Sequence, residues 1–208
     1  IKKSAEKAQP YIVNGVPELN VPSLSPLSMN NINGDIGELK LFFKNITVDT
    51  LSQCKIILIE RSEKLKLDIE LICPITAKGH YTVGGKLFLL LIDGDGPFEL
   101  HTVNIYKKLF KYSISNQTSI VQSGEKHYKI SSFDFKYEAL KKVFFNFENL
   151  FGGDKKKAEP VISILDQSWK EIMDVLGKPV VQEIITQVVK GIGEVFLSIP
   201  SNKLELDD

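Results

Sequence analysis

The sequence predicts an α+β fold in which a strongly curved antiparallel β-sheet wraps a long C-terminal helix and a short helix precedes the sheet. Residues 36–150 show the apolar–polar alternation of strands, and several expected strands are long and contain glycine, which favours curvature. One apolar stripe at helical spacing then runs over residues 161–199. A chain of 208 residues suits one large domain or two small ones, and we expect a single domain over 1–208.

The N-terminal helix is expected over residues 2–14. Asn14-Gly15 is a typical stop, because both residue types tolerate the left-handed conformation that ends many helices. Pro10 lies inside the pattern and predicts a kink or an early end. The apolar residues at helical spacing are Ala5, Ala8 and Ile12.

A proline-rich strap runs from Gly15 to Leu27. Each proline fixes its own φ, removes a backbone donor and pushes the preceding residue toward an extended conformation, which excludes a helix or a central strand. The strap is therefore expected to form a lid at one end of an apolar body. The side chains expected to contact that body are Val16, Leu19, Val21, Leu24 and Leu27.

The strands are expected over residues 39–48, 55–60, 65–73, 78–92, 97–115, 128–130, 133–137 and 143–147. Gly84-Gly85 lies within a long strand and predicts a bend or bulge. Two tight turns are expected, at Asp93-Gly94-Asp95-Gly96 and at Ser123-Gly124-Glu125-Lys126.

The C-terminal helix is expected to begin after Asp154, whose side chain suits the N-cap position. Gly177-Lys178-Pro179 interrupts the apolar stripe. We therefore expect either one kinked helix or two helices stacked in line.

The chain has two cysteines, Cys54 and Cys73, both in expected strands. A disulfide needs them to face each other on one side of the sheet. Alternation across a hairpin that turns near Ser62 places Cys54 opposite residue 70 and Cys73 opposite residue 51, although a bulge would change this register. We therefore favour two free, buried thiols.

Composition argues against several function classes. The 26 basic residues balance 26 acidic residues, whereas nucleic-acid binding calls for a basic face. The longest apolar run, 87–92, is far shorter than the ~20 residues of a membrane-spanning helix, so we expect no stable membrane insertion. The chain begins with Ile1, and a processed or trimmed start is the simplest account. Two sequons, Asn45-Ile46-Thr47 and Asn116-Gln117-Thr118, permit N-glycosylation.

The sequence shows no catalytic or metal-binding pattern. His80, His101 and His127 are scattered, without a Cys, Asp or Glu at metal-ligand helical spacing. There is no Gly-x-Ser-x-Gly motif, and residues 152–157 have the wrong spacing for a phosphate-binding loop. Pro97 stands where a calcium loop starting at residue 93 needs an oxygen ligand. We expect no catalysis, no cofactor and no metal.

The apolar faces of the sheet and the long helix can close on each other as a solid core or can leave a channel. A solid core is the commoner outcome, because protein interiors pack densely and pockets are few. Physical reasoning from the sequence leaves both outcomes open.

Several spaced segments, in order along the whole chain, resemble the takeout and juvenile-hormone-binding family of secreted insect carriers. Gly15-Val16-Pro17-Glu18-Leu19 with residues 21–27 resembles the family's opening strap, and residues 43–48 with Leu51-Ser52 resemble its first-strand motif. Gly85-Lys86-Leu87 with residues 94–98 resembles its central hairpin. Residues 150–154, leading to Trp169-Lys170-Glu171-Ile172, resemble the start of its long helix.

This resemblance implies a tunnel for an apolar ligand between helix and sheet, a secreted, extracellular transport protein of the haemolymph, a monomer, and no enzyme activity. The family usually has a cysteine pair just before and within the first helix, whereas residues 1–53 contain none. Either the sequence starts after that pair or the bridge is missing. Cys54 and Cys73 stand where the family more often has apolar residues.

The expected ligand is an elongated hydrophobic small molecule: a juvenile-hormone-like terpenoid, a fatty acid or a quinone-like lipid. Tyr128, Tyr137 and Ser168 are candidates for a hydrogen bond to its polar end. Which side chains meet depends on strand register, since a slip of one residue inverts the lining. The expected tunnel lining is Leu67, Ile69, Leu71, Cys73, Phe88, Leu90, Val103, Ile105, Tyr128, Ile130, Phe133, Phe135, Phe145, Phe147, Val161, Leu165, Trp169, Ile172, Met173, Leu176, Ile184 and Val188.

Two other functions are weighed against the carrier. In the first, the strap from Val16 to Leu27 is an exposed surface, and the protein is a signalling or chemosensory module that docks to a receptor or membrane. The second is an enzyme acting on lipids, which the missing catalytic constellation disfavours.

Overall fold

The structure is a computed structural model that describes residues 2–63, 66–87, 89–105, 115–122, 124–139 and 141–204, with the backbone alone for 62–63, 103–105 and 115–122. The strands are β1 (Leu27–Met29), β2 (Ile32–Asn33), β3 (Lys40–Val48), β4 (Lys55–Glu63), β5 (Lys66–Leu87), β6 (Leu90–Ile105), β7 (Ser115–Gln122), β8 (Glu125–Ser132) and β9 (Val143–Phe147). The helices are α1 (Lys2–Asn14), α2 (Lys155–Gln167), α3 (Trp169–Ile172), α4 (Lys178–Ser198) and α5 (Ser201–Leu204).

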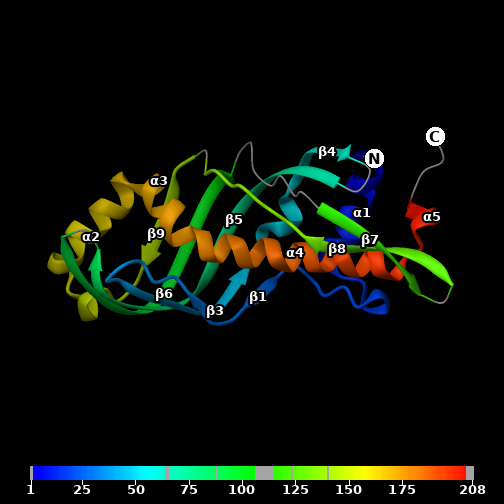
Figure 1. Ribbon diagram of the computed structural model, residues 1–208. Helices are drawn as coiled ribbons and strands as arrows, with labels where there is room; N and C mark the ends of the chain where they lie inside the picture. Colours follow the sequence, from blue (N-terminus) through cyan, green and yellow to red (C-terminus); the bar gives the residue numbers. More distant parts are fainter. Residues whose placement is uncertain are drawn as a thin grey trace.

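An antiparallel sheet in the order β1-β3-β5-β6-β9 forms the body, with β2 also paired to β3 and β4 to β5, and β7 and β8 form a separate hairpin. The sheet curls beneath α4, which runs along the length of the molecule (Figure 1). Its described strands do not close on one another. The predicted fold class, a long C-terminal helix against a strongly curved antiparallel sheet with a short N-terminal helix, is confirmed.

The long helical region is divided into several segments. Asp154 caps α2 as predicted, since its carboxylate accepts hydrogen bonds from the backbone N–H groups of Lys156 and Lys157 at 3.1 and 3.3 Å. α2 ends at Ser168, a break that the apolar stripe does not predict. A π-helical segment, Met173–Gly177, then leads into α4. The predicted interruption at Gly177 therefore coincides with the end of this segment.

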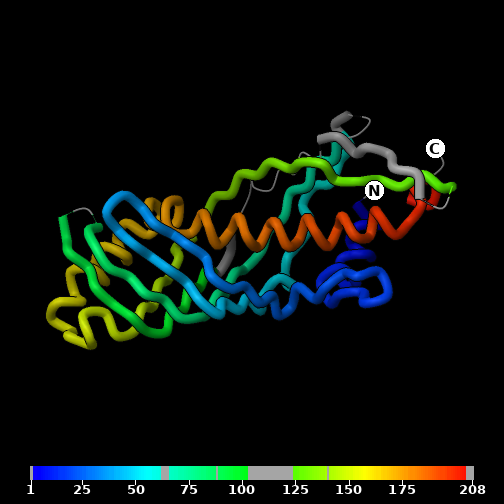
Figure 2. Tube along the Cα trace, turned by 60° about the horizontal axis from the view of Figure 1, so that its bottom comes forward, coloured from blue at the N-terminus to red at the C-terminus, as the bar shows by residue number. Residues whose placement is uncertain are grey.

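The expected burial of the strap is confirmed for Val21, Leu24 and Leu27, whereas Val16 and Leu19 are only half-buried and a short 3₁₀ helix corrects the expectation of a strap without helix. α1 continues past Pro10 to Asn14, and Gly15 ends it with a φ of 83°. Val21, Leu24 and other apolar residues of the strap are buried, while a 3₁₀ turn forms at its first proline. Figure 2 shows the strap in blue, running from α1 beside α4 toward the sheet.

β5 is a single strand of 22 residues, where the sequence predicted two strands over 65–73 and 78–92. Pro74, which ended the first expected strand, lies at a register shift between β5 and β6. A bulge accommodates proline because it leaves a residue outside the hydrogen-bond ladder. Gly85 takes a φ of 121° without a bulge.

The expected turn at Asp93–Gly96 is wrong, because these residues pair with β5 inside β6. The glycines serve close packing. A Cβ at Gly94 would lie 2.7 Å from the Tyr81 hydroxyl, and a Cβ at Gly96 would lie 2.6 Å from the Glu148 carbonyl oxygen. The chain reverses between Leu87 and Leu90 instead.

Two further expectations fall partly or wholly outside the observed strands. Residues 133–139 form no regular strand. Of the strand expected over 97–115, residues 106–114 lie outside the described parts of the structure, and Ser115 begins β7. The turn expected near residue 124 is confirmed, since Gln122 pairs with Glu125.

A disulfide joins Cys54 and Cys73, so the expectation of free thiols is wrong. The β4–β5 hairpin reverses later along the chain than residue 62, and two register shifts move its pairing further. Lys55 pairs with Ile72, which places the preceding Cys54 opposite Cys73. The assumption of simple alternation therefore failed.

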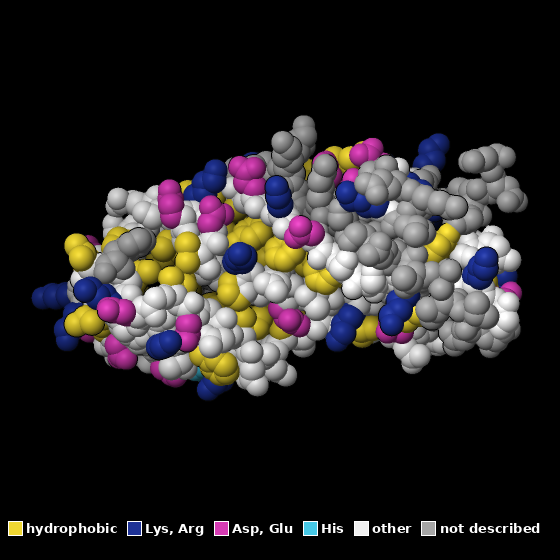
Figure 3. Space-filling view, in the orientation of Figure 1, with side chains coloured by type: hydrophobic (Ala, Val, Ile, Leu, Met, Phe, Trp, Pro, Cys, Tyr) yellow, Lys and Arg dark blue, Asp and Glu magenta, His cyan; other side chains and the backbone are white. Residues whose placement is uncertain are grey.

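Charged side chains of both signs alternate over the surface, with hydrophobic side chains visible between them (Figure 3). No helix in the described parts of the chain is long and apolar enough to cross a membrane.

Gly96→Ala is expected to lower the free energy of unfolding by about 1–3 kcal/mol, because its methyl group would collide with the backbone at Glu148. Gly84→Ala is the matched control on β5, since nothing lies within 4 Å of its added Cβ. Urea unfolding of both variants tests this. Equal stability of the two variants would contradict the packing role of Gly96.

Replacing Cys54 and Cys73 together by alanine is expected to lower the free energy of unfolding by roughly 2–4 kcal/mol, because the bridge closes a loop of 19 residues. Urea unfolding of the variant, compared with the wild type with and without reductant, measures the loss. An unfolding transition of the wild type that reductant leaves unchanged would show that the disulfide does not contribute to stability.

Candidate ligand-binding cavity

A cavity of about 1050 Å³ lies between α1, α4 and the β4–β5 hairpin. Cavities that hold small molecules are commonly ~300–1,000 Å³. Side chains from the strap, β8 and α5 complete the wall. The lining residues with apolar side chains are Ala5, Ala8, Ile12, Val13, Leu24, Leu51, Ile56, Ile59, Leu67, Ile69, Leu71, Ile75, Val181, Ile184, Ile185, Val188, Ile192, Val195, Phe196 and Leu204.

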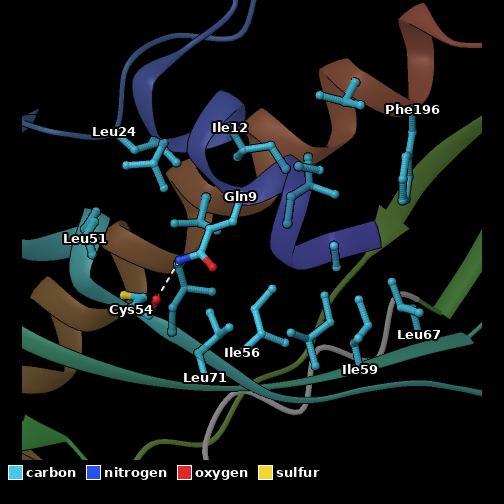
Figure 4. A pocket seen from close by; sticks show the side chains of 18 of the residues that line it. Gln9, Ile12, Leu24, Leu51, Cys54, Ile56, Ile59, Leu67, Leu71 and Phe196 are labelled. Carbon is cyan, nitrogen blue, oxygen red and sulfur yellow. Dashed lines mark hydrogen bonds between the residues drawn. The ribbon is translucent and has the colours of Figure 1, made fainter. Parts of the chain in front are cut away.

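The sheet contributes one face of the β4–β5 hairpin. Leu67, Ile69 and Leu71 alternate along β5, so all three point to the same side. Ile56 and Ile59 lie three residues apart on β4, so simple alternation would place them on opposite sides. A register shift between Ile56 and Leu58 puts both on the side that faces the cavity. Figure 4 shows the side chains of Ile56, Ile59, Leu67 and Leu71 standing on the strands and pointing toward the helices.

The helices contribute the opposite walls. Ile184, Val188, Ile192 and Phe196 recur at helical spacing along α4 and face the cavity. α1 lines the cavity with small residues such as Ala8. The helix backbone can therefore lie close to the cavity while its side chains occupy little of the space.

Gln9 fixes α1 to the sheet at the disulfide. Its Nε2 donates a hydrogen bond of 2.6 Å to the backbone oxygen of Cys54 (Figure 4). Both cysteines of the disulfide line the cavity. One covalent bond and one hydrogen bond therefore hold three wall segments together.

Tyr137 supplies a polar group at the wall. Its hydroxyl donates to the backbone oxygens of Met173 and Asp174, at 2.9 and 3.3 Å. Burial, and then the nearby Asp174 carboxylate, raise the pKa of Tyr137 above its ordinary value of 10.0. The neutral phenol thus ties the wall to the π-helical segment that precedes α4.

Only some residues of the expected tunnel lining meet at the cavity. They are Leu67, Ile69, Leu71, Cys73, Tyr128, Ile184 and Val188. Of the polar candidates, Tyr128 and Tyr137 line the cavity, whereas Ser168 ends α2. Phe88 and the side chains of Val103 and Ile105 lie outside the described parts of the structure.

The remaining expected lining residues pack in or against the solid core. Aromatic contacts fill part of that core, such as Tyr81 against Phe147 with ring centroids 4.8 Å apart. The same core clusters also include cavity residues such as Ile184 and Ile185, so dense packing and a hollow, both left open by the sequence, occur together in this molecule. The residues in question are Leu90, Ile130, Phe133, Phe135, Phe145, Phe147, Val161, Leu165, Trp169, Ile172, Met173 and Leu176.

Sequence reasoning missed the contribution of α1 and β4 to the wall. The stripe of Ala5, Ala8 and Ile12 was the available signal, since a helix with small apolar residues on one face must lie against something. Ile56 and Ile59 escaped because the register shift between them hides their shared side.

The described side chains form no group of three or more His, Cys, Asp and Glu residues that could hold a metal ion. The arrangement offers apolar enclosure with a few polar contacts at its edge. Such a site can hold a molecule by burial of its surface.

The sequence matches that of the family described as haemolymph juvenile hormone binding protein over residues 1–204. The crystal structure of Takeout 1 from Epiphyas postvittana has the same fold, with a TM-score of 0.87 and 24% sequence identity. That match covers 97% of this chain and 93% of the other. No protein with a curated description matches at a significant level.

Tyr137→Phe is expected to lower the free energy of unfolding by about 1 kcal/mol at pH 8, through loss of the hydroxyl hydrogen bond. The folded protein holds the phenol proton more tightly than the unfolded chain, whose pKa is about 10. Wild-type stability therefore falls as the pH rises above about 10, and the variant should fall less steeply.

Urea unfolding between pH 8 and pH 11 measures both effects. Tyr11→Phe is the control, since Tyr11 is 69% exposed. Parallel pH profiles for the wild type and Tyr137→Phe would refute this role of the hydroxyl.

Proposed function

Because the chain belongs to the haemolymph juvenile hormone binding protein family, we propose that it carries an elongated hydrophobic small molecule in the cavity between α1, α4 and the β4–β5 hairpin. The observation that carries the proposal is a cavity of about 1050 Å³ with a mostly apolar wall. Burial of apolar surface contributes about 25 cal/mol per Å², or ~0.8 kcal/mol per CH₂ group. A long chain or ring system therefore gains affinity along the whole cavity.

The carrier acts as one domain over residues 1–208, since α1 near the start and α5 near the end both contribute to one wall. It binds without chemical change of the ligand and as a monomer. Terpenoids, fatty acids and quinone-like lipids all fit this description.

The protein works outside the cell. The Cys54–Cys73 disulfide supports this, because such bonds persist mainly in oxidising compartments. Asn45, in the first sequon, is exposed and accessible to glycosylation there.

The competing idea of a docking strap has less support. Val21, Leu24 and Leu27 are only 2%, 1% and 5% exposed. Their apolar surface is already used inside the molecule, and Leu24 lines the cavity.

The proposal is tested by binding of a fluorescent apolar probe and its displacement by fatty acids and terpenoids. The wild type is expected to bind the probe at micromolar concentration. Ala8→Trp adds an indole to the cavity wall and is expected to weaken binding at least about tenfold, because its bulk takes the space of the probe.

Lys7→Trp is the matched control, since it adds the same group on α1 at an exposed position outside the lining. Absence of displaceable binding by the wild type would end the carrier proposal. Unchanged binding by Ala8→Trp would show that any binding occurs elsewhere.

A further inference from the structure

Resting on the proposed carrier function, we propose that the ligand is an acid with a long apolar tail, and that Arg61 and Lys203 receive its carboxylate at one end of the cavity. Together with Lys66, which has another interaction of its own, they supply every cationic side chain of the described cavity wall. A fatty acid is therefore the favoured class over a neutral ester or a quinone.

The cations follow directly on the apolar wall. Along β4, the side facing the cavity carries Ile56, then Ile59, then Arg61. Lys66 is the first residue of β5 on the other arm of the same hairpin, and Lys203 comes from α5. One end of the hairpin wall is thus charged, and the part toward the disulfide is apolar.

The described wall of the cavity contains no Asp or Glu side chain. Alternation explains this, because Glu60 and Asp68 pair across β4 and β5 between residues that face the cavity. Their carboxylates therefore belong to the opposite side of the hairpin, and the charged side chains in the described cavity wall are all cationic.

Arg61 and Lys203 form no ion pair with the side chains that the structure describes. Other lysines have partners, such as Lys78 with Glu99 at 3.4 Å. A guanidinium matches a carboxylate with two parallel hydrogen bonds, whereas an ester offers only neutral acceptors. A carboxylate at this end would meet complementary charge while its tail lies along the apolar wall.

Dodecanoic acid and methyl dodecanoate test the proposal, because they share a tail and differ in charge at neutral pH. In probe displacement at pH 7.4, the wild type is expected to bind the acid on the order of tenfold more tightly than the ester. Arg61→Gln is expected to remove most of this preference by weakening the acid alone. Lys203→Gln, on α5, is also expected to reduce the preference for the acid over the ester.

Lys55→Gln is the matched control, since Lys55 lies on β4, is exposed and is not part of the cavity wall. Its ratio of acid to ester affinity should equal that of the wild type, and circular dichroism checks the fold of each variant. Raising the salt concentration should also narrow the wild-type preference, because exposed charge interactions are screened.

The outcomes separate the two proposals. Equal affinity for acid and ester in the wild type, or an unchanged ratio in both Arg61→Gln and Lys203→Gln, overturns the acid assignment and leaves the carrier function standing. Failure of the wild type to bind either compound, or the probe, overturns the carrier function itself.

Discussion

Burial of the apolar face of α4 is the interaction on which the rest of the structure depends. The sheet curls beneath this helix without closing (Figure 1). In part of the molecule, aromatic residues such as Phe98 and Phe147 pack against each other in the core. Where α4 meets the β4–β5 hairpin and α1, a wall of mostly aliphatic side chains surrounds the cavity. One helix therefore serves both a solid core and a hollow one.

A hollow needs walls that do not collapse, because dispersion contacts missing across the gap favour closing it. Two bonds oppose collapse here. The Cys54–Cys73 disulfide fixes the start of β4 to β5, and Gln9 ties α1 to the same place. The wall segments are thus cross-linked at the disulfide end of the hairpin. The cationic end lies at the other end of the hairpin, where neither bond acts directly.

The sequence was sufficient for the order and type of most elements, because periodicity, the Asp154 cap and the Asn14-Gly15 stop act over a few residues. It was insufficient wherever an outcome depended on distant partners. Gly94 and Gly96 looked like a turn, but their small size serves contacts with Tyr81 and Glu148. The disulfide was missed because two register shifts cannot be read from alternation. For the same reason, the expected lining shares Leu67, Ile69, Leu71 and Cys73 of β5 with the cavity wall, omits α1 and β4, and includes residues such as Phe145 and Trp169 that lie away from it.

The participation of both α1 and α5 in one wall has a consequence for the order of events during synthesis. These helices are separated by almost the whole described chain, and Lys203 and Leu204 come close to its last residues. The compartment therefore has its complete boundary only after α5 has been synthesised and has taken its place in the wall. Folding intermediates without a docked α5 enclose a guest less fully than the finished molecule does.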